Sequence, residues 1–186
     1  MPVYAAVAVS DVAGYLLGSL PWAYLAARRK GIAIGEVDTR IAGTANVFRQ
    51  VGRRWGVLVF AGDAGKGAAA VAIANLIGAE DALALPALAA AMAWHNWPLL
   101  GLSRLPGGVG LATLAGGCFG AAWLIALPSM TLGVAMIFIL RNTGVGAGFG
   151  LALYAVLGFV TGLDLLLMGG LAALGVLVVA WAKVRR

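Results

Sequence analysis

Charge is scarce in this chain of 186 residues, since only 11% of them are Asp, Glu, Lys or Arg. An average globular domain carries about 25%. Cysteine and histidine are scarcer still, at one residue each. A single cysteine excludes a disulfide framework and a cysteine-rich metal site, and a single histidine argues against a histidine-based one. We therefore expect no metal ion and no cofactor.

Hydrophobic residues take the place of the missing charges, at 62% of the chain and a mean hydropathy of +0.98. A soluble domain of this size has too little interior to bury so much apolar surface. Disorder is excluded as well, because it requires low hydrophobicity. Lipid is the solvent that remains, and helices can cross it with their backbone groups satisfied. The sequence predicts an all-α integral membrane protein with one domain over residues 1–186.

Apolar stretches of roughly 20 residues predict membrane-spanning helices. Six such stretches cover Val3–Ala27, Gly56–Gly78, Ala82–Leu102, Gly108–Leu127, Gly144–Gly162 and Leu165–Trp181. The stretch Thr131–Leu140 is shorter, so the bundle has seven helices if this stretch spans and six if it does not. No basic residue precedes the first stretch, so we expect a span there and not a removable signal peptide.

The positions of the basic residues distinguish a bundle of seven spans from one of six, because Lys and Arg near span ends mark the cytoplasmic side. With seven spans and the N-terminus outside, twelve of the 13 basic residues lie on the cytoplasmic side, and Lys66 lies within a span. Seven of the twelve lie in one loop, Arg28–Trp55. With six spans, Arg141 or the C-terminal basic cluster would face outward. We predict seven spans, N-terminus outside and C-terminus inside.

Two Gly-xxx-Gly pairs lie within the predicted spans, Gly116 with Gly120 and Gly146 with Gly150. Small residues let membrane helices approach closely. We expect these pairs to pack helices within one bundle, with a contact between two copies of the chain as the alternative.

The basic cytoplasmic loop at residues 28–55 is the long polar stretch of the sequence, and such loops usually carry function. Its segment Asp38–Arg49 is rich in hydroxyl, amide and guanidinium groups. These groups suit a phosphate, which the guanidinium of Arg binds through two hydrogen bonds. The alternative is a loop that touches anionic lipid head groups.

The second and third predicted spans contain ionisable residues that are candidates for a site. Asp63 and Lys66 are three residues apart, which places them on one face of a helix. They form either a structural ion pair or part of a site, because ionisable groups in a span face a partner or a polar cavity. His95 either hydrogen-bonds a neighbouring helix or acts as a base.

Three glycines, Gly107, Gly108 and Gly110, lie at the start of the fourth predicted span. Exposed backbone N–H groups at a helix N-terminus form a cradle for an anion. The predicted topology places this turn, Arg104 and the polar loop on the same cytoplasmic face, which predicts one phosphate site.

Taken in order, these motifs resemble those of the bacterial membrane-integral acyl-phosphate:glycerol-3-phosphate acyltransferases. The likeness runs from about Gly14 to Thr113, and Thr39 stands where the family's first cytoplasmic motif has serine. The matching residues are Gly18, Ser19, Pro21, Gly43, Asn46, Val47, Arg49, Asp63, Lys66, Gly67, His95, Asn96, Pro98, Gly107, Gly108, Gly110, Ala112 and Thr113.

The chain also departs from the family pattern. Asp38 and Arg40 replace two glycines of the first cytoplasmic motif, and Pro106 and Val109 replace two lysines of the glycine-rich motif. A divergent member would recruit other cations, such as Arg104, in place of those lysines. The family ends in a His-Arg-x-Asn-Ile-type motif, and the printed sequence stops at about the place where that motif would start.

The resemblance implies a seven-span bundle in the bacterial inner (plasma) membrane, with its site facing the cytoplasm. It implies transfer of an acyl group from acyl phosphate to the 1-hydroxyl of glycerol 3-phosphate, which gives lysophosphatidic acid for phospholipid biosynthesis. Both substrates and membrane lipids are then partners, and nucleic acid is not. The acyl chain would enter from the bilayer between spans rich in Gly and Ala.

The resemblance also implies roles for individual residues. Asn46, Arg49 and His95 are the expected catalytic residues, and Asp63 with Lys66 is an ion pair that braces the floor of the pocket. The expected substrate- or phosphate-binding residues at family positions are Ser19, Thr39, Gly43, Gly107, Gly108, Gly110 and Thr113, and the cations that this chain would recruit in addition are Arg40 and Arg104. The substrate's own phosphate would help to take the proton.

Two other functions remain as alternatives. One is a non-catalytic relative that binds a phospholipid or a phosphorylated metabolite, in line with the altered glycine-rich motif. The other is a small membrane transporter with His95, Asp63 and Lys66 as an intramembrane relay.

Overall fold

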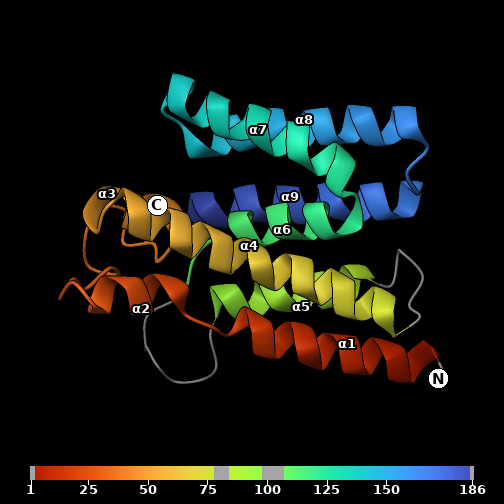
Figure 1. Ribbon diagram of the computed structural model, residues 1–186, viewed down its shortest axis with the longest axis horizontal. Helices are drawn as coiled ribbons and strands as arrows, with labels where there is room; N and C mark the ends of the chain where they lie inside the picture. Colours follow the sequence, from red (N-terminus) through yellow and green to blue (C-terminus); the bar gives the residue numbers. More distant parts are fainter. Residues whose placement is uncertain (1–2, 78–83, 98–106, 185–186) are drawn as a thin grey trace.

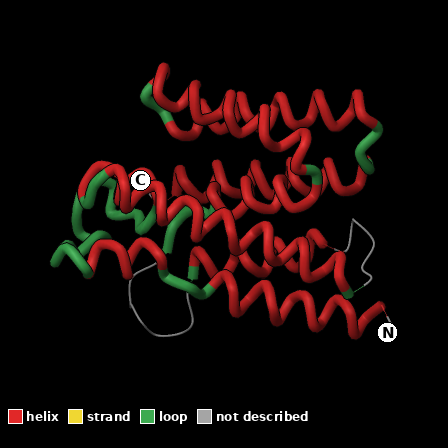
Figure 2. Tube along the Cα trace, in the orientation of Figure 1, coloured by secondary structure: helices red, strands yellow, loops and turns green. Residues whose placement is uncertain are grey.

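The computed structural model describes residues 3–77, 84–97 and 107–184, and every regular element within these ranges is a helix (Figures 1 and 2). The helices are α1 (Val3–Gly18), α2 (Trp22–Arg28), α3 (Thr44–Gln50), α4 (Arg53–Leu76), α5 (Ala84–Asn96), α6 (Leu111–Ala121), α7 (Trp123–Leu140), α8 (Thr143–Thr161) and α9 (Leu165–Val184). Four of them, α4, α7, α8 and α9, are long and apolar enough to cross a membrane.

The first predicted span, Val3–Ala27, is wrong as one continuous helix, because it is broken into α1 and α2. The break covers residues 19–21, and Pro21 stands directly before α2. Proline has no N–H for the helical ladder and disfavours helical geometry in the residue before it. The chain therefore turns at this point.

The border between the fourth and fifth predicted spans is also wrong. The sequence predicts a helix to Leu127 and a short stretch from Thr131, whereas α6 ends at Ala121 and α7 begins at Trp123. Ala122 has φ −154° and ψ 80°, which interrupts the helix between them. The residues on both sides are equally apolar, so hydropathy carries no signal for this border. The stretch Thr131–Leu140, which the sequence analysis expects to be short, is the second half of the 18-residue helix α7.

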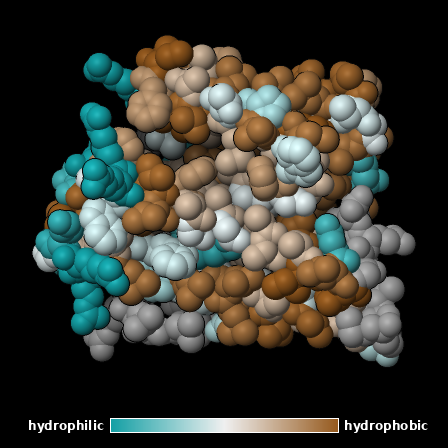
Figure 3. All heavy atoms as spheres, in the orientation of Figure 1, coloured by the Kyte–Doolittle hydropathy of each residue, from teal (hydrophilic) through white to brown (hydrophobic). Residues whose placement is uncertain are grey.

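The other predicted spans agree with helices to within a few residues, and the end of the third, residues 98–102, lies outside the described residues. The polar loop at residues 28–55 holds a short helix, α3, that the sequence analysis missed. Figure 1 places α2, α3 and the C-terminus at one end of the bundle and the N-terminus at the other. Most hydrophilic atoms on the face in Figure 3 gather at the α2–α3 end.

Small residues bring the helices together where they cross. A Cβ atom added to Gly67 would overlap the carbonyl oxygen of Thr113, and one added to Gly116 would overlap that of Ala64, so α4 and α6 touch backbone to backbone. Gly146 packs on Ile137 in the same manner between α8 and α7. Lipid provides no hydrophobic drive between helices, so such close packing holds the bundle together. The Gly-xxx-Gly pairs thus serve packing within one chain.

Candidate active site

A cluster of three ionisable side chains lies buried where α4 crosses α5. The Lys66 ammonium lies 2.8 Å from Oδ1 of Asp63 and 3.3 Å from Nδ1 of His95. The same Asp63 oxygen lies 3.5 Å from His95 Nδ1. The side chains are 2%, 1% and 8% exposed for Lys66, Asp63 and His95. The predicted ion pair is therefore present, and His95 is in contact with it.

The helical repeat explains how these residues meet. Asp63 and Lys66 lie on one face of α4 because they are three residues apart. His95 is in the last turn of α5, and its ring meets that face from the neighbouring helix. Charges within an apolar bundle are costly unless they are paired. Each member of the cluster is thus held in place by the other two.

The glycine-rich turn packs directly on His95. The Gly107 N–H donates to the carbonyl of Asn96, and a Cβ atom at Gly107 would overlap the carbonyl oxygen of His95. A Cβ atom at Gly108 would overlap Nε2 of His95 and would lie 3.1 Å from the carbonyl oxygen of Ala42. The turn requires glycine at both positions because a side chain would meet the backbone carbonyl of His95 at Gly107 and its ring at Gly108.

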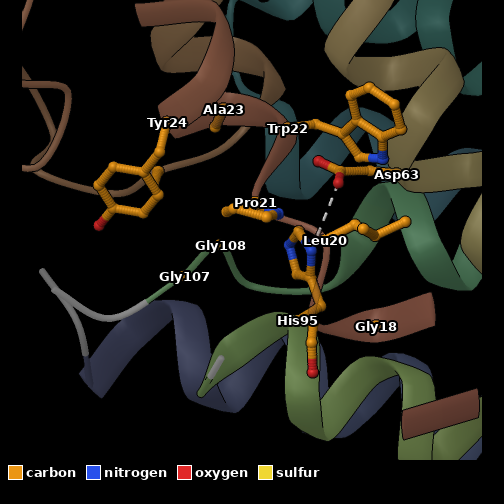
Figure 4. Close-up of a pocket in the computed structure, with 12 residues that line it drawn as sticks. Gly18, Leu20, Pro21, Trp22, Ala23, Tyr24, Asp63, His95, Gly107 and Gly108 are labelled. Carbon is orange, nitrogen blue, oxygen red and sulfur yellow. Dashed lines mark ion pairs between the residues drawn. The ribbon is translucent and has the colours of Figure 1, made fainter. Parts of the chain in front are cut away.

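A small pocket of about 10 Å³, enough for one water molecule, lies beside this cluster (Figure 4). Its lining consists of residues 18–24, Ala42, Asp63, His95, Gly107 and Gly108. In Figure 4 the His95 ring lies beneath Asp63, next to the Pro21 break. The break between α1 and α2 thus forms a wall of the pocket; the sequence predicted Ser19 as a ligand but did not predict the break.

Ser19, a predicted substrate ligand, lines this pocket but is 1% exposed. Its hydroxyl donates to the carbonyl of Tyr15, 2.9 Å away. The pocket thus unites Ser19, Asp63, His95, Gly107 and Gly108 from four separate parts of the sequence.

Asn46 holds the polar loop to α3. It is 2% exposed, and its amide nitrogen lies 3.0–3.1 Å from the carbonyl oxygens of Ile34, Val37 and Ile41, to which it donates. This nitrogen is used within the chain, so Asn46 anchors the loop, and its expected role towards substrate stays a prediction. Ala42 follows Ile41, one of the residues that Asn46 holds, and it lines the pocket.

Arg49 lies on the exposed side of the same loop. Its Nε donates to Oδ2 of Asp38 at 2.6 Å, with the two side chains 46% and 28% exposed. Thr39 and Arg40 are exposed too. Asp38 and Arg40 have φ values of 50° and 55°, which favour glycine. These are the two positions where the acyltransferases named above have glycine, so the positive φ values fall where the resemblance places that residue.

The remaining predicted residues are spread around the cluster. Gly43 precedes α3, Gly110 precedes α6 with φ +86°, and Thr113 is fully buried in α6. None of these three lines the pocket, and neither does Arg49. Arg104 lies outside the described residues. Within the described ranges, no group of three or more His, Cys, Asp and Glu side chains is placed to hold a metal ion.

Comparisons of the sequence with a family model and with curated proteins point to the same family. The sequence model described as glycerol-3-phosphate acyltransferase matches residues 8–186. A glycerol-3-phosphate acyltransferase of Parasynechococcus marenigrum (strain WH8102) is 43% identical over 130 residues, which cover 69% of this chain and 60% of that relative. One of Synechococcus sp. (strain CC9902) is 42% identical over 130 residues, covering 69% and 64%. The chain thus spans a little under two thirds of the length of these curated relatives.

Two crystal structures of PlsY (YgiH), an integral membrane glycerol 3-phosphate acyltransferase, share the fold. The glycerol 3-phosphate form has a TM-score of 0.85 at 25% identity and covers 95% of this chain and 88% of that one. The lysophosphatidic acid form has a TM-score of 0.81 at 24% identity, with 94% and 86% covered. Together with the four long apolar helices, this likeness identifies the chain as an integral membrane protein.

Proposed function

The chain belongs to the glycerol-3-phosphate acyltransferase family, and on that premise we propose that it transfers an acyl group from acyl phosphate to the 1-hydroxyl of glycerol 3-phosphate. The hydroxyl oxygen forms a bond to the acyl carbon, and the bond from that carbon to the phosphate oxygen breaks. The hydroxyl proton leaves on the released phosphate. The products are lysophosphatidic acid, a precursor of phospholipids, and inorganic phosphate.

The observation that carries this proposal is the buried Asp63–Lys66–His95 cluster, closed on one side by the backbone of Gly107 and Gly108. His95 and the glycine-rich turn line the small pocket beside this cluster, where a ring N–H can donate to an oxygen of either substrate. Acyl phosphate is already activated, so positioning and charge stabilisation are sufficient for the reaction. No nucleophilic side chain is needed.

Arg49 is the proposed phosphate ligand on the cytoplasmic surface. Asp38 holds its Nε, which leaves the two terminal nitrogens for two hydrogen bonds to a phosphate. Thr39 and Arg40, exposed on the same loop, are proposed to complete this outer contact. The polar loop would thus collect glycerol 3-phosphate from the cytoplasm beside the pocket.

The groove between α8 and α9 is the proposed place for the acyl chain. Its volume is about 580 Å³, and its lining is apolar except for the hydroxyl of Tyr154 and the ammonium of Lys183. From Met168 to Lys183 it follows α9 for about 22 Å at 1.5 Å per residue. Lys183 lies at the end of the bundle that holds α2 and α3, so it would meet an anionic head group while the chain lies in the groove.

We propose the seven-helix arrangement for the membrane, with α1, α4, α5, α6, α7, α8 and α9 as its helices. The N-terminus would be outside, and the polar loop, Arg141 and Lys183 would lie in the cytoplasm by the distribution of basic residues. The membrane would be the inner (plasma) membrane of a bacterium.

Purified protein in liposomes, given hexadecanoyl phosphate and radiolabelled glycerol 3-phosphate, tests the activity directly. We expect labelled lysophosphatidic acid and one inorganic phosphate per product. Arg53→Lys, a conservative change on the exposed first turn of α4, is the matched control and should act like the parent chain. Hexadecanoyl coenzyme A in place of the phosphate should give no product.

The same preparation separates the alternatives. Binding of labelled glycerol 3-phosphate without any product would indicate a non-catalytic relative and would refute the proposed activity. Accumulation of the label inside sealed liposomes without product would indicate a transporter.

A further inference from the structure

Lys66 contacts two groups at once, the Asp63 carboxylate at 2.8 Å and the His95 ring at 3.3 Å. An ammonium carries three N–H donors and no acceptor. Whatever it hydrogen-bonds must therefore accept. The contact is to Nδ1 of His95, so it is a hydrogen bond when this ring nitrogen presents its lone pair and carries no hydrogen.

A neutral imidazole has its hydrogen on one nitrogen, so a bare Nδ1 puts that hydrogen on Nε2. We propose that Lys66 is a positioning residue that fixes His95 in the Nε2–H form, and that His95 acts as a hydrogen-bond donor to a substrate oxygen and not as a base. The tautomer follows from the contacts alone, whereas the role towards substrate rests on the proposed function.

Asp63 is the competing partner of Nδ1. Its Oδ1 lies 3.5 Å from Nδ1, beyond a good hydrogen bond, and 2.8 Å from the Lys66 ammonium. The carboxylate is therefore engaged by the lysine. If the ammonium is removed, the carboxylate becomes the natural acceptor for a hydrogen on Nδ1. Lys66 thus favours the Nε2–H tautomer of His95, and Asp63 favours the Nδ1–H tautomer. The shorter distance to Nδ1, 3.3 Å from Lys66 against 3.5 Å from Asp63, favours the Nε2–H tautomer.

The position of Nε2 gives this choice a chemical meaning. Nε2 is the ring atom that a Cβ at Gly108 would overlap, so it points towards the glycine-rich turn that lines the pocket. An N–H there stabilises negative charge on an oxygen of the acyl phosphate, such as the acyl oxygen as the bond to phosphate breaks. An Nε2 that already carries hydrogen cannot take the hydroxyl proton. This proton goes to the departing phosphate, as the balanced reaction requires.

His95 is the single histidine of the chain, which makes the tautomer directly measurable. Ring-¹⁵N-labelled histidine gives one pair of nitrogen signals in the full-length protein in lipid. We expect Nδ1 to have the shift of an imine-type nitrogen and Nε2 that of a protonated nitrogen. In Lys66→Met, the hydrogen should move to Nδ1, facing Asp63. A protonated Nδ1 in the parent chain would overturn the proposal, and this measurement needs no variant and no activity.

Activity of two substitutions tests the role of the ring. Glutamine can place an N–H near the position of Nε2 but cannot act as a base, whereas alanine offers neither. We expect His95→Gln to stay within about tenfold of the parent, and His95→Ala to lose roughly 100–1000-fold, as for a lost oxyanion donor. Equal losses in both variants would refute the donor role. Absence of activity in the parent would refute the proposed function instead, and the nitrogen spectrum would still decide the tautomer.

Discussion

The ion pair between Asp63 and Lys66 should be the most sensitive electrostatic contact of the fold. Both side chains are at most 2% exposed, so bulk water screens the pair only weakly. Lys66→Met leaves the Asp63 carboxylate buried beside a ring nitrogen at 3.5 Å as its nearest polar partner in the cluster. Breaking a buried pair by removing one member costs about 3–5 kcal/mol.

For a chain of this size each kcal/mol corresponds to roughly 2–4 °C of melting temperature, so Lys66→Met and Asp63→Asn should each melt roughly 6–20 °C lower. The double variant removes both charges and should recover most of that loss, because no unpaired charge stays buried. Thermal unfolding of the four proteins in one detergent measures this coupling.

The exposed pair of Asp38 and Arg49 is the matched control. Its contact is shorter, at 2.6 Å, but its side chains are 28% and 46% exposed. Water and salt screen such a pair, which is worth about 0–1 kcal/mol. Asp38→Asn should thus change the melting temperature by a few degrees at most. Additive losses without recovery in the buried double variant would show that burial is not what couples Asp63 to Lys66.

Further predictions concern three other parts of the molecule. Arg49→Lys should lose activity nearly as severely as Arg49→Ala, roughly 30- to 1000-fold in kcat/KM, because a lysine ammonium cannot replace the two parallel hydrogen bonds of a guanidinium. Unchanged activity in Arg49→Lys would indicate that the loop contacts anionic lipid head groups and does not bind the substrate phosphate. Gly67→Ala should destabilise the fold by about 1–3 kcal/mol because its Cβ would overlap the α6 backbone, whereas Gly65→Ala, which faces open space on the same helix, should be harmless; equal melting temperatures would contradict this packing. Ala172→Trp should lower turnover of hexadecanoyl phosphate far more than that of octanoyl phosphate by filling the α8–α9 groove; equal losses for both donors would place the acyl chain elsewhere.

Several properties could be predicted from the sequence because they depend on composition and local chemistry. The content of apolar residues required helices as the elements and lipid as the solvent; the structure bears out the helices, and the likeness to an integral membrane protein bears out the membrane. The spacing of Asp63 and Lys66 required a shared helix face. The family's glycines at the positions of Asp38 and Arg40 are typical of positive φ values, which both residues adopt here. Asn46 holds the carbonyls of Val37 and Ile41 on either side of them, and no local pattern in the sequence indicates these contacts.

What the tertiary structure alone decided is how separate segments meet. Helices that are apolar all round carry no stripe that tells which neighbour each face will touch. The end of α6 at Ala121 lies in uniformly apolar sequence, so only packing against α4 and α7 places it. His95 is 29 residues from Lys66, and no local pattern could pair them. The crossing of α4 and α5 brings the ring to the ammonium, and this contact determines which ring nitrogen holds the hydrogen.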